Sequence, residues 1–373
     1  MKGRLYSMKK ILFFLLLLLV FIACNNGRGY NVCVNGTVES GINEGDSIYL
    51  MLLNEQNVAE VKGRDAVRGG SFKLAGNVAL PAVCNVVTFT PDGRLHRRMD
   101  FIAEGGKVEI KVLADYYRVG GTALNDALQM YRDSMEIATR IYKRYYNKKA
   151  ETPTLSSMGV KEADDVMSIA SYQYRTKLYR AIERNIGNIL AAYFIKNNID
   201  IIEPAQALKF IKEMPAEYKD NVIVYLNKLY TAQEKYSEGS PYADFAMRDI
   251  NGKKQVMSDY AGKGKPVLIN VWLSGDKNSI EAQNSLFSLR GEYGKKLEMW
   301  GVSIDQNYNV WHSSVTQKNM CGIQVSDLKG WNSGFLSLYG VDKVPYFILI
   351  DGDGKISYRG TSLNDALSGL LQK

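Results

Sequence analysis

Cysteine and histidine offer the widest range of chemistry in this chain, and both are scarce. The 373 residues contain four cysteines, Cys24, Cys33, Cys84 and Cys321, and two histidines, His96 and His312. A zinc site needs about four ligands at short spacing, and dithiol exchange needs a second thiol that can reach the first. No two of the cysteines are close in the sequence, and neither histidine has a cysteine nearby. We therefore predict no metal site and no cofactor, and we expect both histidines to be ordinary surface or edge residues.

Cys24 ends an apolar segment that begins at Ile11 and follows two lysines. A basic start and an apolar core too short to span a bilayer are typical of a signal peptide, predicted here for residues 1–23. The sequence Phe21-Ile22-Ala23-Cys24 resembles a bacterial lipobox, which implies that Cys24 is acylated and that residues 24–29 form a tether. We expect a membrane anchor in the cell envelope, facing the periplasm or on the outer membrane, since two or three acyl chains hold a protein stably. The alternative is that Cys24 belongs to an uncleaved N-terminal membrane anchor.

The formal net charge of +8 raises the question of nucleic-acid binding. Four of the basic residues lie in the predicted signal peptide, so the mature chain carries about +4, a mild imbalance. The most basic aromatic segment, Lys143–Lys149, ends a predicted helix, where cations suit the helix dipole. We therefore predict no nucleic-acid partner.

The length predicts two or three domains, and the pattern of the chain changes twice. Residues 30–121 contain short β-type runs between Gly and Asp turns, which predicts an antiparallel sandwich or barrel-like module. The runs are Val32–Val38, Ser47–Leu53, Ser71–Ala75, Val83–Thr90, Met99–Ala103 and Lys107–Val112.

Residues 122–236 have helical periodicity. Leu124, Leu128, Tyr131 and Met135 begin an apolar stripe, which we interpret as packing surface, and Thr122 is the expected N-cap. Further helices are expected at Lys161–Ile182, Asn185–Lys196, Pro204–Glu213 and Ala216–Ser237.

Residues 237–373 alternate strand and helix, which predicts an α/β domain. Val267–Trp272, Leu297–Ile304 and Phe347–Ile350 are continuous apolar runs, as expected for central strands that are covered on both faces.

Several short motifs of this last region occur in a characteristic order. They are Phe245, Asp249–Lys253, Ser258–Tyr260, Gly262-Lys263, Gly301–Asp305, Tyr339–Val341, Val344-Pro345 and Asp351–Lys355. In this order they resemble the landmarks of thioredoxin-like domains in the thiol-disulfide oxidoreductase and peroxiredoxin-related group. The resemblance implies a thioredoxin-like α/β fold over residues 237–373 and a family chemistry of disulfide exchange. The β module resembles a domain of unknown function that precedes such domains in envelope lipoproteins, through Gly36, Ile48–Leu50, Gly70–Phe72 and Gly121–Asn125.

The stretch that corresponds to the family's active site departs from its pattern. After Trp272, Asp276 and Ser279 stand where the family has its two cysteines. A carboxylate forms no stable mixed disulfide, and a serine hydroxyl is barely ionised near neutral pH, whereas the family chemistry needs a thiolate at a helix N-terminus. We therefore expect this site to be redox-inactive and Asp276 to cap the next helix. The alternative is that Asp276 and Ser279 line a surviving groove for an extended peptide or a small ligand.

Three further features bear on function. Pro345 matches the family's cis-proline position, which shapes the groove for an extended substrate segment, and Tyr346 follows where a small residue is common. Cys321 is a lone thiol that we expect to be buried, and Cys33 and Cys84 could form a disulfide if their backbones are close enough.

We thus expect a multidomain lipoprotein with an antiparallel β module, an α-helical connector and a C-terminal α/β thioredoxin-like domain. The favoured function is non-catalytic binding or assembly with an envelope protein or an extended peptide. The alternatives are an oxidoreductase that uses the remaining cysteines, with an exposed Cys321 near Pro345, and a purely structural role.

Overall fold

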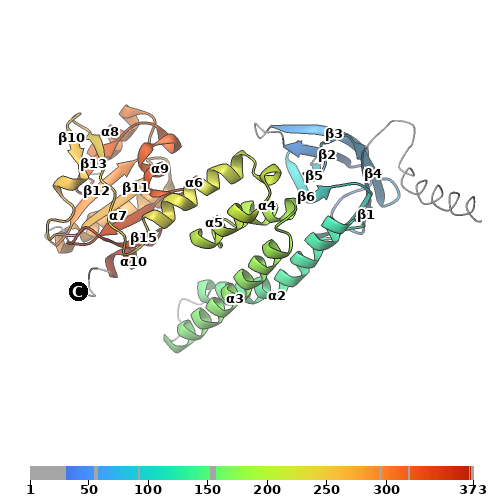
Figure 1. Ribbon diagram of the computed structural model, residues 1–373, viewed down its shortest axis with the longest axis horizontal. Coiled ribbons are helices and arrows are strands. Elements are labelled where there is room, and N and C mark those ends of the chain that lie inside the picture. The colour runs from blue at the N-terminus through green and yellow to red at the C-terminus, as the bar shows by residue number, and fades with distance from the viewer. Residues whose placement is uncertain are drawn as a thin grey trace, which may run out of the picture. The chain divides into compact units, whose positions relative to one another are not determined.

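A computed structural model describes residues 31–53, 58–90, 93–151, 157–293, 296–317, 320–368 and 370 (Figure 1). The predicted signal peptide, the tether and Cys24 lie outside these residues. The chain divides into two compact units, of which the second comprises residues 203–212 and 222–373 and the first the remainder. The predicted domain boundaries are not tested by this division and stay predictions.

The first unit begins with two four-stranded sheets, in the orders β4-β1-β7-β8 and β3-β2-β5-β6. Their strands are β1 (Val32–Val38), β2 (Ser47–Leu53), β3 (Ala59–Ala66), β4 (Ser71–Gly76), β5 (Ala82–Phe89), β6 (Leu95–Ala103), β7 (Lys107–Val112) and β8 (Tyr117–Gly120). Side chains alternate between buried and exposed along β7, as expected for a strand with one covered face. At one edge the sheets approach so closely that a Cβ on Gly63 would lie 2.3 Å from the carbonyl oxygen of Ala75.

The β module was predicted to be purely antiparallel, and this prediction was wrong for one pair of neighbouring strands. β1 runs parallel to β7, from Cys33 opposite Lys107 to Val38 opposite Val112. These strands are far apart in the sequence, so no hairpin dictates their relative direction. The strands β3 and β8 were not predicted, while the bounds of β1, β2 and β7 were predicted correctly.

The described part of the first unit also contains the α-helices α2 (Ala123–Glu151), α3 (Ser157–Arg184) and α4 (Ile189–Lys196). The apolar stripe of α2 is buried at Leu128 and Met135, in agreement with its interpretation as packing surface. Thr122 directly precedes α2 at the predicted N-cap position, and its carbonyl oxygen accepts from the N–H of Asp126 at 2.8 Å. The side-chain acceptor is the Glu104 carboxylate, which accepts from the backbone N–H groups of Leu124 and Asn125 at 2.8 and 3.3 Å.

The second unit contains α5 (Pro204–Glu213), α6 (Asn221–Lys235) and a seven-stranded sheet in the order β10-β9-β13-β12-β11-β14-β15. Its strands are β9 (Ala246–Asp249), β10 (Lys254–Val256), β11 (Val267–Trp272), β12 (Glu298–Ser303), β13 (Ile323–Ser326), β14 (Tyr346–Ile350) and β15 (Ile356–Gly360). Its remaining helices are α7 (Lys277–Tyr293), α8 (Tyr308–Gln317), α9 (Gly334–Tyr339) and α10 (Leu363–Ser368). The central strand β11 is buried at every position, as predicted from its continuous apolar run.

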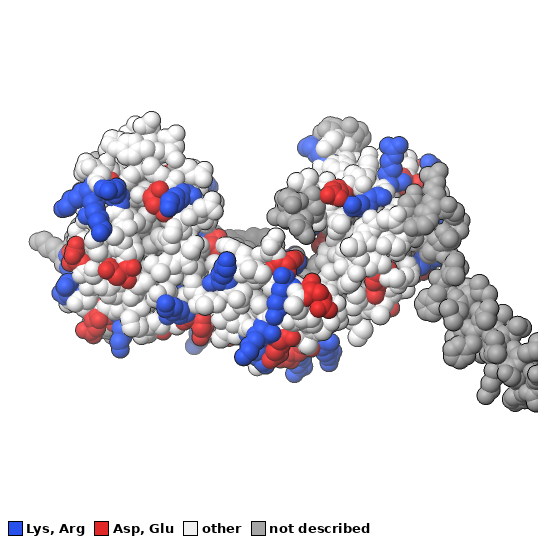
Figure 2. Space-filling model, turned by 45° about the horizontal axis from the view of Figure 1, so that its top comes forward, with Lys and Arg blue, Asp and Glu red and all other residues white. Residues whose placement is uncertain are grey.

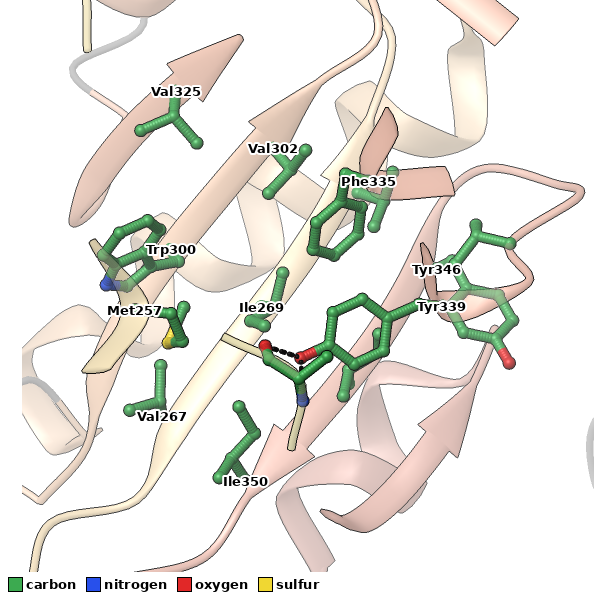
Figure 3. Close-up of a cluster of buried hydrophobic side chains, with 14 of the residues drawn as sticks. Met257, Val267, Ile269, Trp300, Val302, Val325, Phe335, Tyr339, Tyr346 and Ile350 are labelled. Carbon is green, nitrogen blue, oxygen red and sulfur yellow. Dashed lines mark hydrogen bonds between the residues drawn. The ribbon is translucent and has the colours of Figure 1, made fainter. Parts of the chain in front are cut away.

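The two faces of this sheet carry separate hydrophobic cores. Val267, Ile269 and Val271 of β11 pack with α9 on one face, whereas Leu268 packs with α7 and α10 on the other. Figure 3 shows the first core, in which Tyr339 donates to the carbonyl oxygen of Ala243 at 2.7 Å and accepts from its N–H at 3.0 Å. This arrangement places the end of β11 between helices on both faces.

Arg359 of β15 joins α6 to this unit. Its guanidinium donates to the carbonyl oxygens of Tyr236 and Tyr339, each at 2.7 Å, and to that of Gln233 at 3.2 Å. The end of α6 and the sheet are therefore connected through one partly buried guanidinium group. On the face of the molecule in Figure 2, Lys and Arg are interspersed with Asp and Glu.

Candidate functional site

The candidate site lies where β11 ends. β12 runs parallel to β11, with Ser303 opposite Trp272, and β13 runs parallel to β12, with Ser326 opposite Ser303. The carboxyl ends of these strands therefore meet at one edge of the sheet, which we call the carboxyl edge. In open α/β sheets this edge is the usual place for a binding or catalytic site.

The two expected cysteine positions hold Asp276 and Ser279. Both side chains make hydrogen bonds at the N-terminal end of α7. Asp276 Oδ1 accepts from the backbone N–H of Ser279 at 2.7 Å, the geometry of an N-cap. The Ser279 side chain is fully buried, and its hydroxyl accepts from the N–H of Leu273 at 3.4 Å. Disulfide exchange needs an exposed and ionised nucleophile. The buried Ser279 hydroxyl is neither exposed nor readily ionised.

Asp305, which follows β12, holds the loop between β11 and α7. Its carboxylate accepts from the hydroxyls of Ser274 and Ser303 at 2.6 and 2.7 Å and from the N–H of Ser274 at 3.3 Å. Asp305 is only 4% exposed, so these donors replace the water that a carboxylate otherwise requires. The loop that would carry the redox chemistry is thus fixed to the neighbouring strand.

Pro345 lies at the same edge, because Tyr346 pairs with Val271 in the register of β14 and β11. The Val344–Pro345 peptide bond is cis, as the family resemblance implies. The ring of Tyr346 is buried in the core, and its hydroxyl accepts from Arg359 Nε at 3.1 Å. The large side chain at this position, where a small residue is common, is therefore a part of the core.

Trp272 is buried and packs against Trp311 of α8, and its Nε1 donates to Gln324 Oε1 at 3.2 Å. Trp311 also lines a groove of about 910 Å³, whose wall continues through the ends of β9 and β13 and the starts of α8 and α9. The apolar part of the wall includes Phe245, Ile250 and Leu338. This groove, which we call the α8 groove, was not predicted from the sequence.

The loop after β13 forms one side of the α8 groove. Leu328 in this loop has a φ of 56°, a left-handed conformation that is uncommon for a residue other than glycine. Asp327 stabilises the loop, since its carboxylate accepts from the N–H of Lys329 at 3.1 Å, the Ser333 hydroxyl at 2.9 Å and the N–H of Gly334 at 3.2 Å. Strained residues are enriched at functional sites, so the loop geometry agrees with a role in binding.

Cys321 lies away from the candidate site. It precedes β13, so it is placed toward the amino ends of the parallel strands, opposite to the carboxyl edge and Pro345. Its side chain is 9% exposed, and its Sγ donates to the Leu286 carbonyl oxygen at 3.8 Å. The expectation of a buried thiol is confirmed, and the alternative of an exposed Cys321 near Pro345 was wrong.

Cys33 and Cys84 are not joined in a disulfide. Cys84 is buried in β5 of one sheet, whereas Cys33 belongs to β1 of the other sheet and alternates with the buried Val32 and Val34. The two cysteines therefore lie in different sheets, and the disulfide that the sequence left open is not formed. Burial raises the pKa of the Cys84 thiol to about 12, so Cys84 stays protonated near neutral pH.

The described residues contain no group of three or more His, Cys, Asp or Glu side chains that could hold a metal ion. His312 contacts the ring of Tyr308 with a centroid distance of 5.5 Å, and His96 is exposed. In the same part of the chain, no helix has both the length and the apolar character that a membrane span requires.

Comparison with known proteins gives relatives for the last part of the chain. It is 28% identical over 147 residues to the thiol-disulfide oxidoreductase ResA of Bacillus thuringiensis, which covers 39% of this chain and 82% of that protein. It is 29% identical over 133 residues to ResA of Bacillus subtilis, which covers 35% of this chain and 70% of the relative. No family model matches the chain.

Two solved structures resemble the same region. A thiol-disulfide oxidoreductase from Bacteroides fragilis is 27% identical, covers 36% of this chain and 98% of its own, and aligns with a TM-score of 0.33. The thioredoxin domain of a thiol-disulfide oxidoreductase from Bacteroides vulgatus is 23% identical, covers 36% and 96% of the two chains, and has a TM-score of 0.33.

The sequence relatives are thiol-disulfide oxidoreductases, and 39% of this chain is similar to the first of them. That Asp276 and Ser279 stand at the positions of the family's two cysteines stays a prediction from the sequence motifs.

Proposed function

We propose that this chain is a lipid-anchored protein of the bacterial cell envelope whose thioredoxin-like domain binds a partner instead of exchanging disulfides. The observation that carries the proposal is the state of Asp276 and Ser279. The first caps α7 and the second is buried, so neither can attack a disulfide. The lipobox resemblance of Phe21–Cys24 supports the envelope location.

The remaining cysteines give little support to the alternative of an oxidoreductase. Cys321 is buried toward the opposite edge of the sheet, and the pKa of Cys84 is raised to about 12 by burial. A nucleophilic cysteine needs exposure and a lowered pKa. Neither of these two thiols meets both requirements.

Reduction of insulin disulfides tests the redox part of the proposal. The native chain is expected to be inert, and a variant with Asp276→Cys and Ser279→Cys is expected to gain at least tenfold in rate, because it restores two thiols at a helix N-terminus. A Cys321→Ser variant is the matched control. If the native chain reduces insulin and Cys321→Ser abolishes the activity, the proposal fails.

The α8 groove is the proposed place of binding. Its apolar wall, with Arg248, Asp249, Asp327 and Lys329 among its polar residues, suits an extended peptide that buries alternate side chains. Peptides selected from a random displayed library against the native chain should lose at least tenfold in affinity for Leu338→Glu, which places a charge in the wall. Val310→Glu is the control, since Val310 is 49% exposed and does not line the groove. Equal loss of affinity in both variants, or in neither, would contradict binding in this groove.

A further inference from the structure

The first unit contains a second groove, of about 860 Å³, which is independent of the thioredoxin-like domain. Its wall is formed by parts of β6, β8, α2 and α3. We call it the α2 groove. A concave site of this volume matches the size range of small-molecule pockets.

The wall of the α2 groove carries more cations than carboxylates. Its six cationic side chains are Arg97, Arg98, Arg118, Arg132, Arg140 and Lys143, and its carboxylates are Asp115, Asp133 and Glu136. Arg118 pairs with Asp133 at 2.7 Å, and Arg140 pairs with Glu136. Asp100, on β6 behind the wall, accepts from Arg98 at 3.2 Å. The local field therefore favours an anion even after these pairs are formed.

Among these cations, Arg132 has the most extensive contacts with the wall of the α2 groove. Its Nη2 donates to the Tyr117 hydroxyl at 2.9 Å, to the Asp100 carbonyl oxygen at 3.2 Å and to the Tyr193 hydroxyl at 3.4 Å. Its guanidinium lies over the Tyr117 ring, 4.7 Å from the centroid. These contacts engage Nη2 and the face of the guanidinium and leave Nη1 outside the network.

The other end of the same guanidinium is unsatisfied. Nη1 of Arg132 is buried and has no hydrogen-bond partner. A buried charged donor without an acceptor is costly, so this position calls for an oxygen acceptor. Tyr117 is held neutral, because burial raises its pKa, and therefore adds no negative charge that would repel an anion.

We propose that the α2 groove binds a small organic anion, a carboxylate or phosphate on a sugar-sized polar ring, with Arg132 as its anchor. The two N–H groups of Nη1 can donate to the oxygens of either anion. A modest rotation of the side chain toward the groove brings Nη1 to the ligand, as is common when ligands bind. Tyr174 in the wall and Tyr116, which is 57% exposed, offer aromatic faces to the ring.

Calorimetric titration of the full chain in detergent tests the proposal, with glucuronate, glucose 6-phosphate and glucose as probes. At least one of the two anions should bind, and glucose should bind at least tenfold more weakly. The stronger of the two anions identifies the ligand as a carboxylate or a phosphate. If neither anion binds, or if glucose binds equally well, the proposal is overturned.

Substitutions inside and outside the α2 groove test whether the anion binds there. Arg132→Met should weaken the anion at least tenfold, whereas Arg144→Met should change it less than twofold, because Arg144 is exposed on the same helix and does not line the groove. Lys143→Met gives a second test that does not depend on the buried network, with an expected two- to fivefold loss and a weaker dependence on salt. If both groove variants bind as the native chain does, the proposal is overturned.

Discussion

Removal of the Asp305 carboxylate should destabilise the thioredoxin-like domain more than any exposed acidic substitution. Asp305→Ala deletes the acceptor of three hydrogen bonds and leaves the Ser274 and Ser303 hydroxyls without it. Hydrogen bonds to a charged group contribute about 1.5–3 kcal/mol each, and losses within one network are not additive, so we expect a total of about 3–5 kcal/mol.

Urea unfolding followed by tryptophan fluorescence measures this loss in the second unit alone. All four tryptophans, Trp272, Trp300, Trp311 and Trp331, belong to that unit. With a denaturant dependence of about 2 kcal/mol per molar urea, the midpoint should fall by about 1.5–2.5 M. Asp305→Asn keeps the acceptor without the charge and should lose less than half as much.

Asp353→Ala is the matched control, because this carboxylate is exposed on the turn before β15. Its midpoint should stay within about 0.3 M of the native value, as is usual for surface substitutions. If Asp305→Ala shifts the midpoint no more than Asp353→Ala does, Asp305 does not hold the loop between β11 and α7, and the description of the site is wrong.

Two further predictions concern the cap and the buried thiol. Asp276→Ala should lower the stability of the second unit by about 0.5–2 kcal/mol in the same urea assay, and Asp276→Ser should recover most of it, since serine is also a good N-cap; equal midpoints for the two variants would refute the cap. Cys84 should resist alkylation in the folded chain at pH 8 and react on unfolding, because burial raises its pKa from the ordinary 9.0 to about 12. The protonated thiol is favoured in the folded state, so the contribution of Cys84 to stability is constant below pH 9 and falls as the pH rises from 9 toward 12. A Cys84→Ala variant should lack this fall in stability. If the native chain shows no such fall, the raised pKa of Cys84 is contradicted.

The sequence predicted those parts of the fold that depend on local pattern. The continuous apolar runs of β11 and β14 predict central strands, and both strands are buried at every position. β3 was missed because its Lys62, Arg64 and Asp65 mask the apolar alternation, and β8 because it has only four residues. The direction of β1 against β7 follows from tertiary pairing, which no local pattern encodes.

The two grooves could not be predicted, since each combines segments that are distant in the sequence. The α8 groove joins Ile250, Trp311 and Leu338, and the Arg132 network spans 61 residues to Tyr193. Tyr131 and Met135 of the apolar stripe also line the α2 groove, so one stripe serves both packing and a cavity wall. A helical period identifies the buried face of a helix but does not show where that face leaves the core.

On the proposed function, Asp276 stabilises the helix end at which the family chemistry would need a thiolate. In the active members of the class, a thiolate at a helix N-terminus is stabilised by the helix dipole. Asp276 places a permanent carboxylate at the same position, where it accepts from the N–H of Ser279 at 2.7 Å. The electrostatic demand of the helix end is thus met by a group that cannot form a disulfide. An apolar replacement at this position would leave the helix end without this cap.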